Sequence, residues 1–328
     1  MSRQHSNNQE WKKLSNLISY YEVCNRSEGK SPKTVTWYST NLERFRRYLK
    51  DKHLAGSIDN VDITLLREYV LYLMNASKAK GQCGKSLKGD RLSPATVHCH
   101  VRTLRAFFSW LQREGFTENN LGSGLKPPKV PQRVVSPLSD EEIRAVLGTF
   151  NHKNPCDARN QAIVMILLDT GIRTGELINL KLGDLHLEEG FFKVMGKGQK
   201  ERIVPIGNNA QRALQKYLYR YRLNPANAST ENVFLSIHGE PLTDNSMKLV
   251  FARLAQESKV QRLHAHLCRH TFATRFLING GDIFSLQQIL GHSTLEMVRH
   301  YVSLASSHTV IQLHQRFSPL DRLNLRRA

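Results

Sequence analysis

Residues 266–301 read HLCRHTFATRFLINGGDIFSLQQILGHSTLEMVRHY, and they form the most informative stretch of the chain. The stretch contains the pair His266-x-x-Arg269, the tetrapeptide Leu290-Gly291-His292-Ser293 and, shortly afterwards, Tyr301. Tyrosine is a weak nucleophile because the pKa of its phenol is near 10, so a reactive tyrosine needs cations beside it. The motifs named above supply one arginine and two histidines. The stretch therefore predicts a compact site built around a tyrosine nucleophile.

Two upstream segments add charged groups to this set. The first is Gly171-Ile172-Arg173-Thr174-Gly175-Glu176, and the second is Gly196-Lys197-Gly198-Gln199-Lys200. Glu176 lies within helical reach of Arg173, where it would either orient the guanidinium or form an ordinary surface pair. Lys197 falls at the tip of a predicted hairpin, from which an amine can protonate a leaving oxygen.

The combination suits attack on a DNA backbone phosphate without a metal. A phosphodiester under attack gains negative charge on its non-bridging oxygens, which fixed cationic donors must stabilise. Arg173 and Arg269 are the candidates, because the arginine fork is always charged and binds two oxygens at once. His266 and His292 would donate hydrogen bonds or transfer protons near neutral pH. Taken singly, each of these residues is more often structural: an ion-pair arginine, a solvated turn lysine or a packed tyrosine.

A zinc site at His264, His266 and His270 is a rival hypothesis, because these spacings are possible ligand geometry. No cysteine or carboxylate motif completes such a site, and Arg269 would repel the metal. We therefore predict no metal and no other cofactor.

Charge points to nucleic acid as the partner. The chain has 328 residues, a formal net charge of +19 and a pI of about 9.9, and both halves of the chain contribute to the excess. Phosphate neutralisation rewards Lys and Arg that are distributed in this way. No apolar stretch reaches the roughly 18 residues of a membrane span, and the start MSRQHSNNQEWKK lacks the apolar core of a secretory signal. We expect double-stranded DNA, and no membrane, as the partner.

The cysteines indicate a reducing compartment. There are five, scattered along the chain without a C-x-x-C pair, which fits neither a disulfide framework nor a zinc ribbon. We expect a cytoplasmic protein with mostly inert thiols, and a packing role for Cys268 within the site motif.

The N-terminal part is predicted to be helical. Ser31-Pro32 and Ser93-Pro94 are start signals, each a capping residue followed by proline at the first helical position. A further helix would begin at Asp62 or Thr64 and end near Met74. The expected core positions are Trp37, Leu42, Phe45 and Leu49 in the first helix, Leu65, Leu66, Tyr69 and Leu73 in the second, and Val97, Val101, Leu104, Phe108 and Leu111 in the third.

A proline-rich segment, Leu125 to Pro131, divides this part from the rest. Beyond it, Ser139 and Glu142 have capping-box spacing, Ala162 to Leu168 predicts a buried helix, and Phe191–Met195 with Arg202–Ile206 predicts a β-hairpin. The fold class is therefore mainly α with a small antiparallel β-sheet. We assign 1–14 to a tail, 15–125 to a helical DNA-binding domain, 126–138 to a linker and 139–328 to a catalytic domain with a C-terminal tail.

A glycine-containing basic segment, Asn75 to Arg91, is either a solvated flexible loop or a loop that closes on DNA phosphates. The candidate DNA contacts are Lys78, Lys80, Lys85, Lys88 and Arg91, with Lys200 and Arg202 from the hairpin.

Together these motifs resemble the tyrosine recombinases, or integrase family, and within it the Xer and transposon-integrase branch. The resemblance runs from about residue 15 to residue 305. It implies that Arg173, Lys197, His266, Arg269 and His292 are catalytic and that Tyr301 is the nucleophile.

The resemblance also implies a two-domain DNA clamp, with a SAM-like core-binding domain, that cleaves and rejoins specific sites through a 3′-phosphotyrosine. A homotetramer would form on two DNA sites, and its protomers could be monomers in solution before they bind. A partner recombinase or an accessory protein is a further option. Thr309 to Leu313 and the tail after it would dock on a neighbouring protomer.

The outcome would be integration or excision of a mobile element, or resolution of DNA dimers. The long basic loop favours a mobile element, and the short segment before the first helix favours simple sites. Two alternatives remain open: a type IB topoisomerase-like nicking and resealing activity, and a DNA-binding protein of the same fold that does not cleave.

Overall fold

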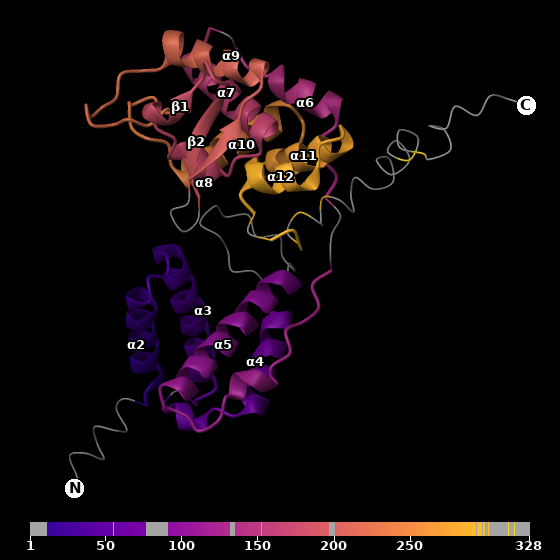
Figure 1. The fold of residues 1–328 in the computed structure, drawn as a ribbon. Coiled ribbons are helices and arrows are strands. Elements are labelled where there is room, and N and C mark those ends of the chain that lie inside the picture. Colours follow the sequence, from indigo (N-terminus) through magenta and orange to yellow (C-terminus); the bar gives the residue numbers. More distant parts are fainter. Residues whose placement is uncertain are drawn as a thin grey trace, which may run out of the picture. The chain divides into compact units, whose positions relative to one another are not determined.

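The computed structural model describes residues 12–54, 56–76, 91–131, 135–151, 153–196 and 201–292, together with residues 294–296, 298, 301, 314 and 318. The chain divides into two compact units, Met1–Arg133 and Val134–Ala328 (Figure 1). Each unit has its own hydrophobic core. The first unit is helical and the second combines helices with a small antiparallel sheet, which confirms the predicted fold class.

The helices of the first unit begin at the predicted signals. They are α2 (Leu14–Ser27), α3 (Pro32–Asp51), α4 (Ile63–Asn75) and α5 (Pro94–Arg113), with 3₁₀ turns at Ile58–Asn60 and Leu121–Gly124. The hydroxyls of Ser31 and Ser93 accept hydrogen bonds from backbone N–H groups one turn later. Asp62, not Thr64, caps α4, because its carboxylate accepts from the backbone N–H of Leu65 at 2.7 Å.

One predicted core residue of the first unit is wrong. The other twelve predicted apolar positions are buried, but Trp37 is 37% exposed and lies beside Tyr38, with ring centroids 5.2 Å apart. Val35 takes the inward position instead, at 2% exposure. At 3.6 residues per turn, Trp37 lies about 200° around the helix from Val35, so the two cannot both face the core.

The second unit is built around α7 (Pro155–Thr170), which packs against α9 (Asn208–Lys216) and α11 (Ala265–Ile278). Five residues in its middle are fully buried, as the apolar stretch predicted: Ala162, Ile163, Val164, Ile166 and Leu167. The capping box before α6 is also present, because Ser139 and Glu142 exchange backbone-to-side-chain hydrogen bonds. The other helices of the described part are α6 (Asp140–Leu147), α8 (Thr174–Ile178), α9 (Asn208–Lys216), α10 (Asp244–Glu257), α11 (Ala265–Ile278) and α12 (Ile283–Leu290), with a 3₁₀ turn at Leu182–Asp184 and a π-helical turn at Tyr217–Tyr221.

The sheet has three antiparallel strands in the order β1-β2-β3. β2 (Phe191–Met195) matches the prediction, and β3 (Glu201–Pro205) begins one residue earlier than predicted. β1 (Leu185–His186) was not predicted, since two residues are too few to show an alternating pattern. Residues 197–200, which hold Lys197 and Lys200, lie outside the described residues.

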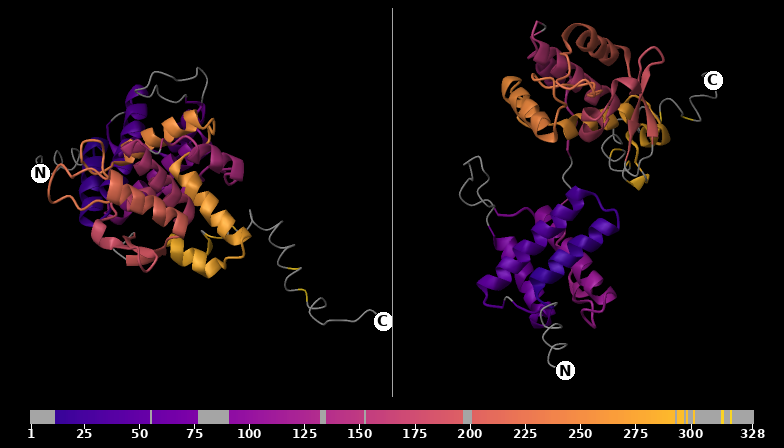
Figure 2. Two further views of the ribbon diagram at one scale, coloured as in Figure 1. Left: turned by 90° about the horizontal axis from the view of Figure 1, so that it is seen from above. Right: turned by 90° about the vertical axis from the view of Figure 1, so that its left-hand side faces the viewer.

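The elements that carry the predicted site meet within the second unit. α12 follows α11 and packs against both α11 and β3 (Figure 2). Tyr301 belongs to a small separate core with residues of α11 and α12, including Leu277, Leu286 and Leu290. Across the described part of the chain, no helix combines the length and apolarity of a membrane span.

Candidate active site

Arg269 lies between the ends of two helices. It is 3% exposed on α11, and its guanidinium donates to the carbonyl of Gly171 at 2.6 Å and to that of Leu290 at 2.9 Å. These carbonyls belong to the C-terminal ends of α7 and α12, where helix carbonyls lack helical partners and carry partial negative charge. Two helix ends therefore hold one buried guanidinium. Burial and the nearby charge of Arg173 lower the pKa of Arg269 to about 10, so it is still charged at neutral pH.

Glycine is required at the α7 end of this arrangement. Gly171 has a φ of +61°, a left-handed conformation that side chains disfavour. A Cβ atom there would lie 2.4 Å from Phe272 Cδ1 and 2.8 Å from Leu290 Cδ2. The missing side chain thus lets α7 end directly against α11 and α12, with its last carbonyl directed at Arg269.

Arg173 is held from two sides and remains partly open. Its guanidinium donates to Glu176 at 2.9 Å and to the carbonyl of Gly291, the residue that ends α12, at 3.2 Å. Its backbone N–H also donates to Glu176, at 2.9 Å. The Arg173 side chain is 38% exposed, whereas that of Glu176 is 8% exposed. Glu176 is therefore a buried anchor for the Arg173 guanidinium, which remains accessible, and the two do not form a plain surface pair.

His292 directly follows the end of α12 and contacts both Arg269 and Tyr301. Its Nε2 is 2.7 Å from Nη2 of Arg269, and its ring stacks on that of Tyr301 with centroids 6.3 Å apart. Burial and the surrounding arginines lower its pKa to about 4, so the ring is neutral near pH 7. Because arginine can only donate, Nε2 is the acceptor and the proton resides on Nδ1. Nδ1 is buried and has no hydrogen-bond partner among the described residues.

Tyr301 is 6% exposed and lies within this cluster. Burial raises the pKa of its phenol, while the charges of Arg269 and Arg173 and a hydrogen bond with Arg269 act in the opposite direction. Its ring also lies 5.3 Å from that of His270. The phenol is therefore protonated at neutral pH and sits beside the cations that would stabilise its anion.

His266 lies at the exposed start of α11, one turn before Arg269. Partial desolvation and the positive charge of Arg269 lower its pKa, so it too is neutral near pH 7. A neutral imidazole at this place can accept a proton from one partner or donate its own to another.

The structure thus brings Arg173, Arg269, His292 and Tyr301 into one cluster, with His266 at its edge. Lys197, Lys200 and the loop lysines Lys78, Lys80, Lys85 and Lys88 lie outside the described residues. Arg91 is described and exposed, just before α5.

The side chain of Arg202 is mostly buried in an ion pair, unlike that of an open DNA contact. Its side chain is 13% exposed and donates to both carboxylate oxygens of Glu176, at 2.8 Å each. Sequence reasoning grouped Arg202 with the basic hairpin and missed this ion pair. Strand alternation was the available signal, since Arg202 shares a face with buried Val204.

The histidines of the rival zinc hypothesis have other partners. Nδ1 of His264 accepts the backbone N–H of Leu267 and caps α11, and Nε2 of His270 is hydrogen-bonded to the carbonyl of Val135. Among the described residues, no group of three potential metal ligands comes together.

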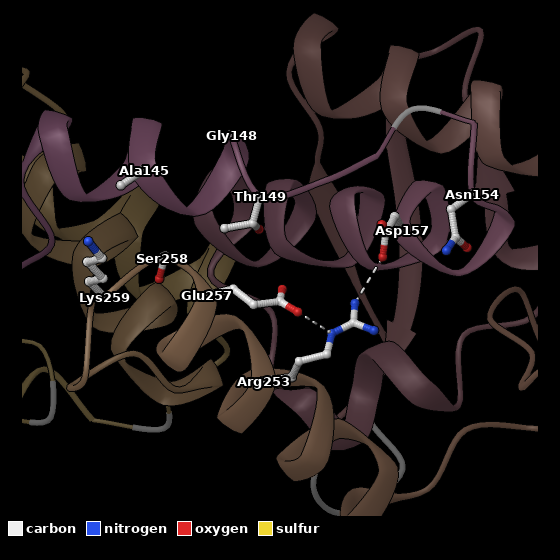
Figure 3. Close-up of a pocket in the computed structure, with 9 residues that line it drawn as sticks. All are labelled: Ala145, Gly148, Thr149, Asn154, Asp157, Arg253, Glu257, Ser258 and Lys259. Atoms are coloured by element: carbon white, nitrogen blue, oxygen red, sulfur yellow. Dashed lines mark hydrogen bonds and ion pairs between the residues drawn. The ribbon is translucent and has the colours of Figure 1, made fainter.

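A pocket of about 530 Å³ lies away from this cluster, between α6, α7 and the end of α10 (Figure 3). Its lining includes the ion pair of Arg253 with Asp157, at 2.9 Å, and the polar residues Thr149, Asn154 and Ser258. None of the predicted site residues lines it. The site is recognised by its convergent charged groups and not by this pocket.

Family profiles match both parts of the chain. The phage integrase family matches residues 137–308, and the phage integrase SAM-like domain matches residues 16–122. Among curated relatives, tyrosine recombinase XerC of Oceanobacillus iheyensis is 32% identical over 296 residues, covering 89% of this chain and 92% of the relative. Tyrosine recombinase XerD of Listeria innocua is 32% identical, covering 88% and 95%.

Solved structures share the fold. The Tn1549 transposon integrase in complex with transposon right end DNA has a TM-score of 0.71 at 21% identity, covering 92% of this chain and 99% of that one. The XerH site-specific recombinase in its post-cleavage complex has a TM-score of 0.66 at 22% identity, covering 94% and 85%. With a catalytic-domain profile over more than half of its length and relatives 32% identical along most of it, the chain belongs to the phage integrase family and is a tyrosine recombinase of the Xer-like branch.

Proposed function

We propose that Tyr301 is the nucleophile with which this recombinase cleaves and rejoins DNA at specific sites. The observation that carries the proposal is the placement of the Tyr301 phenol beside a buried arginine and a neutral histidine, Arg269 and His292. Attack by the phenolic oxygen forms a bond to phosphorus and breaks the bond from phosphorus to the 5′ oxygen. The product is a 3′-phosphotyrosine, which retains the bond energy for rejoining.

Three groups are suited to hold the phosphate during this step. Arg173 has an accessible guanidinium, Arg269 carries a fixed charge, and Nδ1–H of His292 is a buried donor. All three are fixed before DNA arrives, so little reorganisation is needed as charge develops on the non-bridging oxygens. Because the imidazole of His292 is neutral, it acts as a hydrogen-bond donor and does not supply a further charge.

Two proton transfers complete the step. The phenol loses its proton as it attacks, and neutral His266 is suited to accept it. The departing 5′ oxygen gains a proton, for which we propose Lys197 as the donor. In the reverse reaction a 5′ hydroxyl attacks the phosphotyrosine and both protons return, so cleavage and rejoining balance without a cofactor.

We further propose double-stranded DNA as the partner, bound by both units, with four protomers acting on two sites in the cytoplasm. The net charge of +19 supports DNA binding, as does the fold shared with a transposon integrase solved on transposon DNA. The basic segment from Asn75 to Arg91 favours integration or excision of a mobile element over dimer resolution. Plasmids with two sites in direct or inverted orientation separate these outcomes by their products.

Covalent capture tests the nucleophile. Duplexes selected for binding from a random-sequence library are nicked near the recovered site, incubated with the full chain and quenched in detergent. We expect an adduct that peptide mass spectrometry places on Tyr301. Tyr301→Phe should bind the same duplexes and give no adduct.

Tyr219→Phe is the matched control, because Tyr219 is 85% exposed on the π-helical turn and outside the cluster. An adduct on any other residue, or unchanged capture by Tyr301→Phe, would overturn the proposal. Capture and plasmid relaxation that ignore DNA sequence would favour the topoisomerase-like alternative, and binding without capture would favour the non-cleaving one.

A further inference from the structure

Arg202 directs its whole guanidinium into the protein. Nη1 and Nη2 donate to the two carboxylate oxygens of Glu176 at 2.8 Å, and Nε donates to the carbonyl of Ile289 at 3.0 Å. A bidentate pair of this kind fixes both the position and the plane of the two groups. Arg202 therefore ties β3 to the start of α8 and to the end of α12.

The end of α12 is held by three arginines in succession. The carbonyls of the consecutive residues Ile289, Leu290 and Gly291 accept from Arg202, Arg269 and Arg173, respectively. Each arginine comes from a different part of the second unit: β3, α11 and the residue preceding α8. His292 follows directly, so the three contacts together determine where its ring lies.

Glu176 links the same arginines through its carboxylate. One oxygen accepts from the guanidinia of Arg173 and Arg202, and the other accepts from Arg202 and the backbone N–H of Arg173. Two guanidinium charges thus surround one buried carboxylate. Without Arg202, Glu176 and Arg173 would form a neutral pair, and Arg173 would present less net charge to a phosphate.

Close packing supports the same assignment. Gly291 ends α12 with a φ of +63°, and a Cβ atom there would lie 3.0 Å from Cδ and Nε of Arg202. The Arg202 side chain thus fills the space beneath the loop that leads to His292. Each of its three nitrogens donates to a protein acceptor, and the side chain is only 13% exposed.

We propose that Arg202 is a positioning residue of the catalytic centre, which sets the end of α12 and the charge of Glu176, and that it is not a DNA contact. The inference rests on the proposed function, since the groups it positions are Arg173 and His292. It replaces our expectation from the sequence that Arg202 binds DNA.

Salt dependence and cleavage rate separate the two roles. Removing one phosphate contact lowers the slope of log affinity against log salt by about 1. We expect Arg202→Gln, in the full chain, to keep the wild-type salt slope. We expect its single-turnover cleavage to fall about 100-fold, the loss typical of a displaced catalytic group. Arg212→Gln, which removes an exposed arginine of α9, should retain wild-type cleavage.

A pH profile gives a readout that simple loss of stability would not change. Burial raises the pKa of Glu176, but hydrogen bonds and charge from Arg202 and Arg173 outweigh it and hold the pKa below its usual value. Arg269 adds a further positive charge near Glu176. Removing Arg202 should therefore raise the pKa of Glu176, so the acid side of the cleavage profile should move to higher pH.

Arg202→Lys provides a second variant in case the glutamine substitution impairs folding. Lysine keeps the charge beside Glu176 but lacks the planar fork that makes the bidentate contact, so the wild-type pH profile should return with only part of the rate. A wild-type cleavage rate in Arg202→Gln, a salt slope lower by about 1, or an unshifted pH profile in both variants would overturn the inference. Absence of a Tyr301 adduct in the wild-type chain would instead contradict the proposed function.

Discussion

Arg173 and Arg269 differ in burial, and this difference separates their predicted substitution effects. Arg173 is an accessible cation anchored by Glu176, whereas Arg269 is buried and satisfies the carbonyls of two helix ends. Arg173→Ala removes the proposed phosphate donor and leaves Glu176 paired with Arg202. Arg269→Ala also leaves two helix-end carbonyls without their partner.

We therefore expect both variants to lower single-turnover cleavage by about 100–1,000-fold, the scale of a lost transition-state donor. Only Arg269→Ala should also destabilise the second unit, by about 1–3 kcal/mol for the unpaired buried groups. Cleavage assays and urea unfolding measure the two effects. Near-wild-type cleavage in either variant would contradict its catalytic role, and equal stability losses would contradict the difference in burial.

His292 predicts a pH dependence of stability. Its pKa in the folded protein is about 4, below the usual value of about 6.5, so at intermediate pH the unfolded chain binds a proton that the folded chain does not. The free energy of unfolding should therefore fall as pH decreases from about 6.5 to about 4, and this contribution should be fully present above pH 7.

His292→Gln removes this titration, so the second unit should lose less stability between pH 7 and pH 5 than the wild type does. Urea unfolding at the two pH values tests it. His100 has a pKa lowered to about 4 by burial in the first unit, and it should contribute a similar loss that His292→Gln leaves unchanged. An identical pH dependence in wild type and His292→Gln would show that the ring is not buried as a neutral base.

Helix starts were the elements most readily predicted from the sequence. Serine or aspartate caps and following prolines are local signals, and Ser31, Asp62, Ser93 and Ser139 all act as predicted. Order and spacing likewise identified the clustered site residues. The arginine contacts to Ile289, Leu290 and Gly291 could not be predicted, because they depend on how β3, α11 and α8 pack against the end of α12.

One prediction was wrong and one ion pair was missed, for different physical reasons. Trp37 was assigned to the same helix face as Leu42, Phe45 and Leu49, but the buried residue on that side of α3 is Val35. Arg202 was grouped with the candidate DNA contacts of the basic hairpin, and its ion pair with Glu176 was missed. Its alternation with Val204 on β3 indicated an inward side chain, and the charge pattern obscured that signal.

The end of α7 supplies a prediction about an element. Gly171→Ala places a Cβ atom in a left-handed backbone conformation and against Phe272 and Leu290. We expect the second unit to lose about 2–4 kcal/mol, from backbone strain and overpacking together. Gly183→Ala is the control, because an added Cβ there meets nothing within 4 Å and φ is not in the left-handed range. Equal urea midpoints for the two variants would refute the packing argument.

The two units have separate cores, but all described residues of the catalytic cluster come from the second. The first unit can therefore contribute to DNA affinity without supplying any of these clustered groups. Basic residues exceed acidic ones in both halves of the chain, so both units can contribute to DNA affinity. Because the clustered groups lie in the second unit alone, DNA affinity and cleavage rate should respond to different substitutions.

DNA binding by the whole chain should weaken steeply with salt, because each neutralised phosphate releases condensed counterions. With several contacts, affinity should fall on the order of 1,000-fold or more between about 50 and 200 mM salt. Arg91→Gln, at an exposed arginine of the first unit, should lower the salt slope by about 1 and leave cleavage of bound DNA unchanged. Arg202→Gln should instead keep the wild-type salt slope and lower the cleavage rate. A flat salt response in the wild type would contradict phosphate-dominated binding, and a lost cleavage rate in Arg91→Gln would show that the first unit contributes to chemistry as well as to affinity.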